Sequence, residues 1–139
     1  MSRFADYVTA LSGFLAATLT DYSFNPGSPP DTLPPASTAT AYVWVTETVP
    51  DPANQLVAEI SAMVRLFPVQ AERFDGLTPI DPAPLYDAAE VLEQTIATNS
   101  VPGGSGPWFM ACRQVGFDHD AQFVDALIVG TTWNDAAVS

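Results

Sequence analysis

The only histidine of the chain lies in an acidic run, Asp118-His119-Asp120, which is its densest group of residues that could do chemistry. Carboxylates beside an imidazole can bind a metal ion or act as a general acid–base pair. A metal site draws three or four ligands from several elements, however, and side chains alternate in direction along an extended chain. Three neighbours in one turn therefore do not converge on an ion, and we interpret the run as a polar turn between two strands.

Cys112, the single cysteine, is the next candidate, as a nucleophile. A thiol needs an activating base beside it, and His119 lies across the end of the same predicted strand arm. Free cysteine is among the residue types that are most often buried, so Cys112 is expected to be a packing residue. One cysteine also excludes a disulfide within the chain and a metal site built of several thiolates.

Three further patterns are weaker as signs of catalysis. Asp81 precedes a proline, which is typical of a helix N-cap followed by the first helical residue. The sequence GGSG at 103–106 is followed neither by a lysine nor by a helix, as a phosphate-binding loop would be. No pattern marks any serine as a nucleophile. The sequence thus predicts a protein that is not an enzyme, with no catalytic residue, no metal ligand and no cofactor site.

Aromatic residues on one predicted strand indicate a protein-binding surface rather than a catalytic site. The strand places valines on one face and larger or polar residues on the other, with Val43, Val45 and Val49 opposed to Tyr42, Trp44, Thr46 and Thr48. One face must meet the helices, and exposed aromatic residues on the other are typical of a protein contact. We therefore expect Tyr42, Trp44 and Thr46 to contact another subunit or a partner.

The overall charge narrows the class of partner. The 139 residues carry 16 acidic side chains against four arginines and no lysine, which gives a formal net charge of −12. Without a basic surface to neutralise phosphates, specific binding of DNA or RNA is not expected. No apolar run approaches the ~20 residues of a membrane-spanning helix. The chain, 1–139, is expected to form one soluble domain.

Two helices are predicted from apolar residues that recur every three or four positions. The first spans Ser2–Thr20, and the second begins at Asp81-Pro82 and ends before Asn99. Their apolar stripes are Phe4, Tyr7, Val8, Leu11, Phe14, Leu15 and Leu19 in the first, and Leu85, Ala88, Ala89, Leu92 and Ile96 in the second.

Four strands are predicted, in two antiparallel hairpins. Ala41–Val49 and Leu56–Phe67 form the first hairpin, and Trp108–Phe117 and Phe123–Trp133 form the second. Alternating apolar residues in Leu56–Phe67 indicate a strand with one buried face. We expect an α+β (α/β sandwich) fold, in which a mostly antiparallel four-stranded sheet packs against the two helices.

A proline-rich segment, 25–40, lies between the first helix and the first predicted strand and holds five of the 13 prolines. Proline has no amide hydrogen to give to a helix or a sheet. We therefore expect a long arm without internal pairing, whose Pro29, Pro30, Pro34 and Pro35 reach an adjacent subunit or the neighbouring ring. The tail, 134–139, is expected to be flexible.

The order of these elements resembles that of the tail terminator proteins of long-tailed, siphovirus-type bacteriophages. The resemblance lies in the helix sequence DPAPLYDAAEVLEQTI from Asp81 to Ile96, in the closing strand Phe123–Trp133, and in the preceding strand Leu56–Phe67. It extends over nearly the whole chain. It consists of the order of the elements and the general character of their residues, and it includes no catalytic or metal motif.

The resemblance implies a structural virion protein that assembles as a homohexameric ring at the head-proximal end of the tail. Such a ring caps the tail tube, ends tube polymerisation and joins the tail to the head-side connector. Its partners would be further copies of itself, the major tail tube protein and the head–tail connector or neck protein. DNA would pass through the lumen without specific binding, no membrane is involved, and assembly would take place in the host cytoplasm.

Three alternatives remain open. Other phage neck proteins, of the head-closure and connector types, have similar length and composition. An acidic protein that mimics DNA and inhibits a DNA-binding enzyme is a second reading of the charge, and a small α+β barrel enzyme is a third. A ring elutes as a large oligomer, whereas a mimic of this length is expected to be a monomer or dimer.

Overall fold

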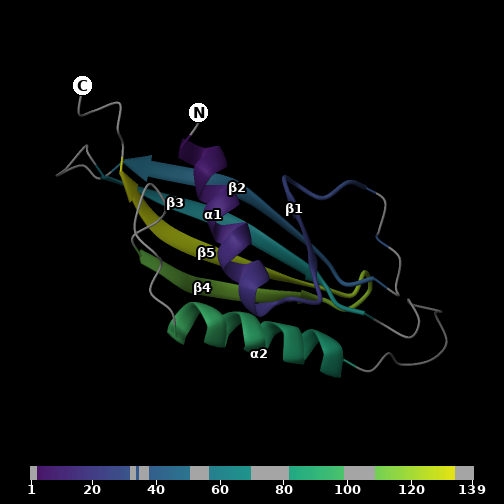
Figure 1. Cartoon of the computed structure of the whole chain (residues 1–139). Helices are drawn as coiled ribbons and strands as arrows, with labels where there is room; N and C mark the ends of the chain where they lie inside the picture. Colours follow the sequence, from purple (N-terminus) through teal and green to yellow (C-terminus); the bar gives the residue numbers. More distant parts are fainter. Residues whose placement is uncertain are drawn as a thin grey trace.

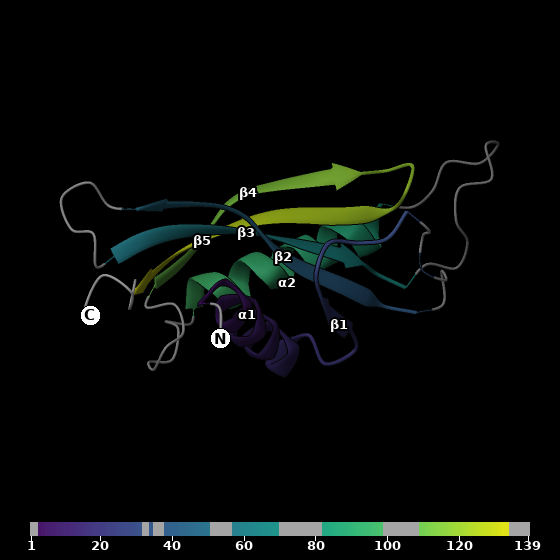
Figure 2. The same ribbon diagram turned by 90° about the horizontal axis from the view of Figure 1, so that it is seen from above.

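Two helices lie on the same side of a five-stranded sheet in the computed structural model of the protein (Figures 1 and 2). The structure describes residues 3–31, 34, 38–50, 57–69, 82–98 and 109–133, and these counts refer to that part. The helices are α1 (Arg3–Thr18) and α2 (Ala83–Thr98). The strands are β1 (Ser23–Pro26), β2 (Thr40–Pro50), β3 (Val57–Phe67), β4 (Phe109–Asp118) and β5 (Phe123–Trp133).

The strands are arranged in the order β1-β2-β3-β5-β4. Each neighbouring pair is antiparallel except β1 and β2, which run parallel. The second predicted hairpin therefore joins the first through β5, which lies beside β3. This places β3 and β5 in the interior of the sheet and leaves β1 and β4 as its edge strands.

Both helices pack on this sheet through the stripes that the sequence predicts. Tyr7, Leu11 and Leu15 of α1 are at most 1% exposed, and α2 buries its stripe on the same side. The carbonyl oxygen of Pro82 accepts hydrogen bonds from the amides of Leu85 and Tyr86 at 3.0 and 3.1 Å, which forms the first turn of α2. Pro82 thus precedes the helix, one position before its predicted place, and Asp81 lies outside the described residues.

The core lies between the helices and the near face of the sheet. In β3 every second residue from Ala58 to Leu66 is fully buried, which confirms the predicted alternation. These residues and their cross-strand neighbours meet the helix stripes in one apolar cluster, whose strand members are Ala41, Val43, Ile60, Ala62, Val64, Leu66, Val124, Ala126 and Ile128. Apolar burial on this face is the main stabilising contribution to the fold.

The prediction of a mostly antiparallel four-stranded sheet is wrong, because a fifth strand makes the sheet mixed. Ser23–Pro26 pairs in parallel with Thr40–Val43, and the amide of Gly27 donates to the carbonyl oxygen of Val43 at 2.7 Å. Asn25 and Pro26 therefore belong to β1 and not to an unpaired arm. Proline is tolerated there because β1 is an edge strand, whose outward amide has no ladder partner. Residues 32–33 and 35–37 of the predicted arm lie outside the described residues.

The predicted faces of β2 are correct up to Val45 and wrong beyond it. A β-bulge between Val45 and Glu47 inserts Thr46 as an extra residue. As a result Thr48 is paired with Ile60 on the helix side, whereas Val49 lies on the opposite side and is 46% exposed. Strict alternation cannot reveal a bulge, because the inserted residue reverses the direction of every side chain after it.

Candidate functional site

The face of the sheet that carries neither helix is the strongest candidate site, and we call it the open face (Figure 2). In the register of β2, β3 and β5 its central residues are Tyr42, Trp44, Ser61, Met63, Arg65, Phe67, Phe123, Asp125, Leu127 and Val129, and Thr40, Glu47, Val49 and Glu59 lie on the same side toward its ends. They alternate with core residues, and most are half-buried. Large apolar and aromatic side chains therefore occupy the side of the sheet that the described helices do not cover.

Arg65 lies at the centre of the open face and is held by a carboxylate and two rings. Its Nε donates to Oδ1 of Asp125 at 2.6 Å, and its Nη2 donates to Oδ2 at 2.8 Å. Its guanidinium carbon lies 3.9 Å from the ring centroid of Phe123 and 5.6 Å from that of Trp44. A bidentate ion pair under aromatic rings is stronger and more rigid than a typical surface pair.

Phe67 connects this group to a second set of rings. Its centroid lies 5.3 Å from that of Phe123 and 6.1 Å from that of Tyr42, the latter at an interplanar angle of 87°. Tilted and edge-to-face arrangements of this kind are favourable between aromatic rings. Phe67 is only 2% exposed although it lies on the open face, because its neighbours enclose it. The aromatic cluster, Tyr42, Trp44, Phe67 and Phe123 around Arg65, is thus a packed surface rather than a set of loose side chains.

The electrostatics of this cluster do not favour acid–base chemistry. Hydrogen bonds to Asp125 raise the pKa of Arg65, with smaller contributions from the charges of Asp125 and Asp118, against a lowering by burial. The guanidinium therefore keeps its proton at every working pH. A neutralised ion pair among aromatic rings suits contact with another protein surface, where Trp, Tyr and Arg side chains contribute most of the binding energy.

The predicted contact residues divide between this cluster and the edge of the sheet. Tyr42 and Trp44 belong to the aromatic cluster, whereas Thr46 is the bulge residue and donates from Oγ1 to the carbonyl oxygen of Ser61 at 3.2 Å. Among the predicted proline contacts, Pro29 and Pro34 are half-buried, Pro30 is exposed, and Pro35 lies outside the described residues. The arm contacts expected from Pro29, Pro30, Pro34 and Pro35 remain a prediction.

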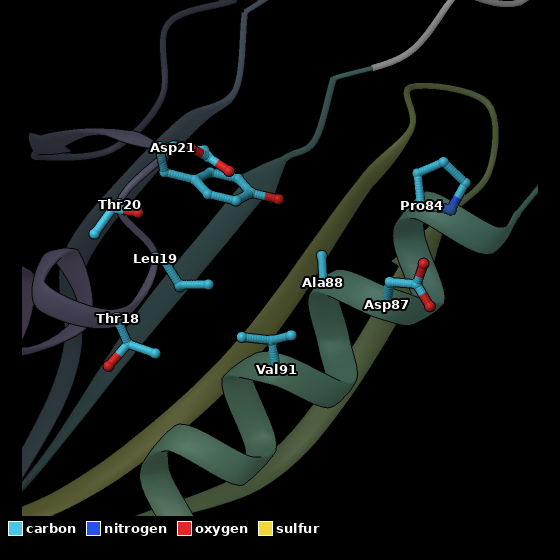
Figure 3. Close-up of a pocket in the computed structure, with 9 residues that line it drawn as sticks. Thr18, Leu19, Thr20, Asp21, Pro84, Asp87, Ala88 and Val91 are labelled. Carbon is cyan, nitrogen blue, oxygen red and sulfur yellow. The ribbon is translucent and has the colours of Figure 1, made fainter.

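A groove of about 290 Å³ runs between the turn after α1 and the first half of α2 (Figure 3). Leu19 faces Ala88 and Val91 of α2 across it, and Asp21 and Asp87 carry carboxylates at its margins. Tyr22 also lines it, and burial, with the nearby charge of Asp21, raises the pKa of this phenol to about 12. An apolar floor between carboxylates suits an aliphatic chain with a cationic end.

The two residues that the sequence presents as possible catalysts have other surroundings. His119 is exposed and stacks on Phe117 with a centroid distance of 6.1 Å, while Oδ1 of Asp118 accepts from the amides of Asp120 and Ala121. The run is thus a polar turn, as predicted. Burial, reinforced by the charge of Glu93, raises the pKa of the Cys112 thiol, which keeps it protonated and weakly nucleophilic.

The residues that the structure describes contain no group of three or more His, Cys, Asp or Glu side chains placed to hold a metal ion. None of the helices that the structure describes is long and apolar enough to cross a membrane. No protein-family model matches the sequence, and no curated protein matches it.

Proposed function

We propose that the protein is a structural component of a bacteriophage tail, which forms a ring that caps the tail tube and joins it to the head-side connector. The observation that carries the proposal is the aromatic cluster on the open face. It offers large, ordered rings on the side of the sheet opposite the described helices, which is how protein contact surfaces are built. The resemblance of the element order to tail terminator proteins supports the same function.

The charge of the chain fits this role. Six copies would carry a formal charge of −72, six times the −12 of one chain. Acidic walls repel the DNA backbone, so a genome would pass through such a ring without adhering to it. A head-closure or connector ring would share these properties, and the position of the ring in the tail separates those roles.

The test is the assembly state of the purified protein, alone and with its tail-tube neighbour. Light scattering after gel filtration is expected to find a species of about 89 kDa, six times the 14.8 kDa chain. Negative-stain microscopy of the mixture is expected to show a ring at one end of each tube. A protein that is monomeric at every concentration and leaves tubes uncapped would contradict the proposal.

A pair of variants connects that assembly to the open face. Trp44→Ala removes a ring of the aromatic cluster, and Tyr86→Ala is the matched control, since Tyr86 is 47% exposed on α2, on the other side of the sheet. We expect the first to weaken assembly or capping and the second to leave both unchanged.

The acidity also fits an acidic mimic of DNA, which is the second candidate function. The same gel filtration separates the two, since a mimic is expected to remain a monomer or dimer. Inhibition of a DNA-binding enzyme by such a small species, with no capping of tubes, would favour the mimic.

A further inference from the structure

Each edge of the described sheet has a stretch of strand with no described strand on its outer side. β4 is the last strand at one edge, and no described strand flanks it on its outer side. At the other edge β1 covers only Thr40–Val43 of β2, so Trp44–Pro50 has no described strand on its outer side. An edge strand exposes alternate N–H and C=O groups that can pair with another chain.

The strand directions make these two edges compatible. From β2 to β3, β5 and β4 every step is antiparallel, so β4 runs opposite to β2. A rotation about an axis along the strands preserves their direction. In copies related by such a rotation, β4 of one therefore meets β2 of the next in antiparallel orientation, which is the more stable pairing.

Charge and the two bulges select one register. Arg113 on β4 is the bulge residue of that strand, its side chain is 60% exposed, and Glu47 beside the bulge of β2 is exposed. When Arg113 lies opposite Glu47 of the next copy, Met110–Gly116 pairs with Pro50–Trp44. The two bulges then lie side by side. Each bulge reverses the direction of the side chains that follow it, so opposed residues lie on the same face on both sides of the bulges.

The faces agree at four pairs of this register whose sides are given by the pairing within the sheet. Cys112 and Thr48 both lie on the helix side, since they are paired with Ile128 and Ile60 in their own sheet. Val115 and Val45 also share the helix side, while Ala111 and the exposed Val49 share the open side. Gly116 comes to lie opposite Trp44, which leaves room for the indole ring.

We propose that copies of this chain join edge to edge, with Met110–Gly116 of β4 paired antiparallel to Trp44–Pro50 of β2 in the next copy. The contact joins two different surfaces, so it repeats from copy to copy and closes into a ring when the rotation allows. This inference deepens the ring-forming function proposed above and rests on it. It also gives Trp44 and Thr46 a subunit contact at the free edge of β2.

One contact within the chain competes with this arrangement and is weak. Nη1 of Arg113 lies 3.7 Å from Oε1 of Glu59, and the two side chains are 60% and 48% exposed. Ion pairs that are long and exposed contribute little to stability. Arg113 can therefore exchange Glu59 for Glu47 of the next copy at little cost.

Cys112 makes the register testable by cross-linking. Thr48→Cys would place a second cysteine opposite Cys112 of the neighbouring copy, on the same face. The Oγ1 of Thr48 is buried without a hydrogen-bond partner, so its loss should not disturb the fold. Within one chain the two sulfurs would be at least about 14 Å apart, three strand spacings, which is too far for a disulfide.

The control is Val49→Cys, whose new cysteine is one residue away but on the open face. After oxidation with diamide, Thr48→Cys is expected to give a ladder of covalent dimers, trimers and larger species on a non-reducing gel. The cross-linked fraction should exceed that of Val49→Cys by about tenfold, because only the former has the Cβ geometry that a disulfide needs.

Charge reversal provides an independent test of the same pair. Arg113→Glu and Glu47→Arg should each weaken self-association about fivefold or more, and the double variant should restore it. Glu59→Gln, which removes the contact within the chain without placing a cation beside Arg113, should leave self-association within about twofold of wild type.

The outcomes separate this inference from the proposed function. An oligomer in light scattering in which Thr48→Cys cross-links no better than Val49→Cys would overturn the edge pairing and leave the ring. Covalent dimers without higher species would also overturn it, because a head-to-tail contact does not stop at two. A monomer at all concentrations, with no ladder, would overturn both.

Discussion

The two faces of the sheet differ although the same strands supply both. On the helix side of β3, Val64 and Leu66 are fully buried against α1 and α2. On the open side of the same strand, Arg65 is held by Asp125 and by the ring of Phe123. Apolar burial thus stabilises one face, whereas an ion pair among aromatic rings stabilises the other. The effects of substitutions on the two faces should therefore be measurable separately.

The largest effect should come from a charge placed on the helix side. Ile128 is fully buried, whereas its neighbour Leu127 is half-buried on the open face. Ile128→Asp would bury an unpaired carboxylate and cost about 4 kcal/mol or more of the free energy of unfolding. Urea denaturation, followed by circular dichroism, measures the loss.

Leu127→Asp is the matched variant on the open face. We expect it to cost much less stability and to weaken assembly instead, because the Leu127 side chain lies on the open face, where contact with another protein is proposed. Equal loss of stability from both substitutions would mean that the open face is buried within the monomer, and the distinction between the faces would be lost.

An intermediate effect is expected from the ion pair of the open face. Asp125→Ala leaves the guanidinium of Arg65 half-buried without its bidentate acceptor, and both side chains are only 24% exposed. A cost of about 1–2 kcal/mol lies between the values for surface and buried pairs. Thermal unfolding measures it, with Glu59→Ala as a control that should cost less than about 0.5 kcal/mol, since its ion pair is exposed. Equal costs would show that the rings do not strengthen the pair.

A smaller effect, of opposite sign, should follow from Tyr7→Phe on the helix side. The Tyr7 hydroxyl is buried without a hydrogen-bond partner, so its removal should raise the free energy of unfolding by about 1 kcal/mol. Burial also raises the pKa of this phenol above its ordinary value of 10.0.

The pH dependence of that variant has a definite sign. Above pH 10 the unfolded chain loses the phenolic proton of Tyr7 while the folded protein retains it, so wild-type stability should fall as the pH rises further. The stability of Tyr7→Phe should fall less steeply with pH. Tyr22, whose pKa is raised to about 12, accounts for part of the fall that the variant still shows. Identical alkaline profiles for wild type and variant would contradict the burial of this hydroxyl.

The smallest effect concerns the ionic strength at which the protein assembles. Chains of charge −12 repel one another, and the Debye length shortens from about 30 Å at 0.01 M salt to about 8 Å at 0.15 M. The association constant, measured by sedimentation equilibrium, should therefore rise about threefold over this range. A fall would mean that attraction between charges dominates at the contact, and Arg113 is the described cation best placed for it.

The periodic parts of the fold could be predicted from the sequence. The stripes of α1 and α2 and the alternation in β3 follow directly from apolar burial, since each helix or strand shows its own period. The polar turn at His119 and the half-buried Cys112 follow from the same local reasoning. The aromatic cluster could be foreseen only in part, through Tyr42 and Trp44.

The remaining features depend on which strands become neighbours. Arg65 and Asp125 are 60 positions apart, and only the pairing of β3 with β5 brings them together. The bulge at Thr46 and the strand β1 also arise from pairing, because the register of a partner strand decides which residues are inserted and which short segment joins an edge. A single sequence carries no direct signal for such contacts.

The short strand β1 has a consequence for solubility. A long, fully bare edge accepts almost any extended chain, including strands of misfolded copies, and promotes aggregation. By covering Thr40–Val43, β1 removes four of the eleven residues of the β2 edge, those in the most buried part of this strand. The remaining edge, Trp44–Pro50, contains a bulge and carries the negative charge of Glu47. A nonspecific strand therefore pairs poorly with it.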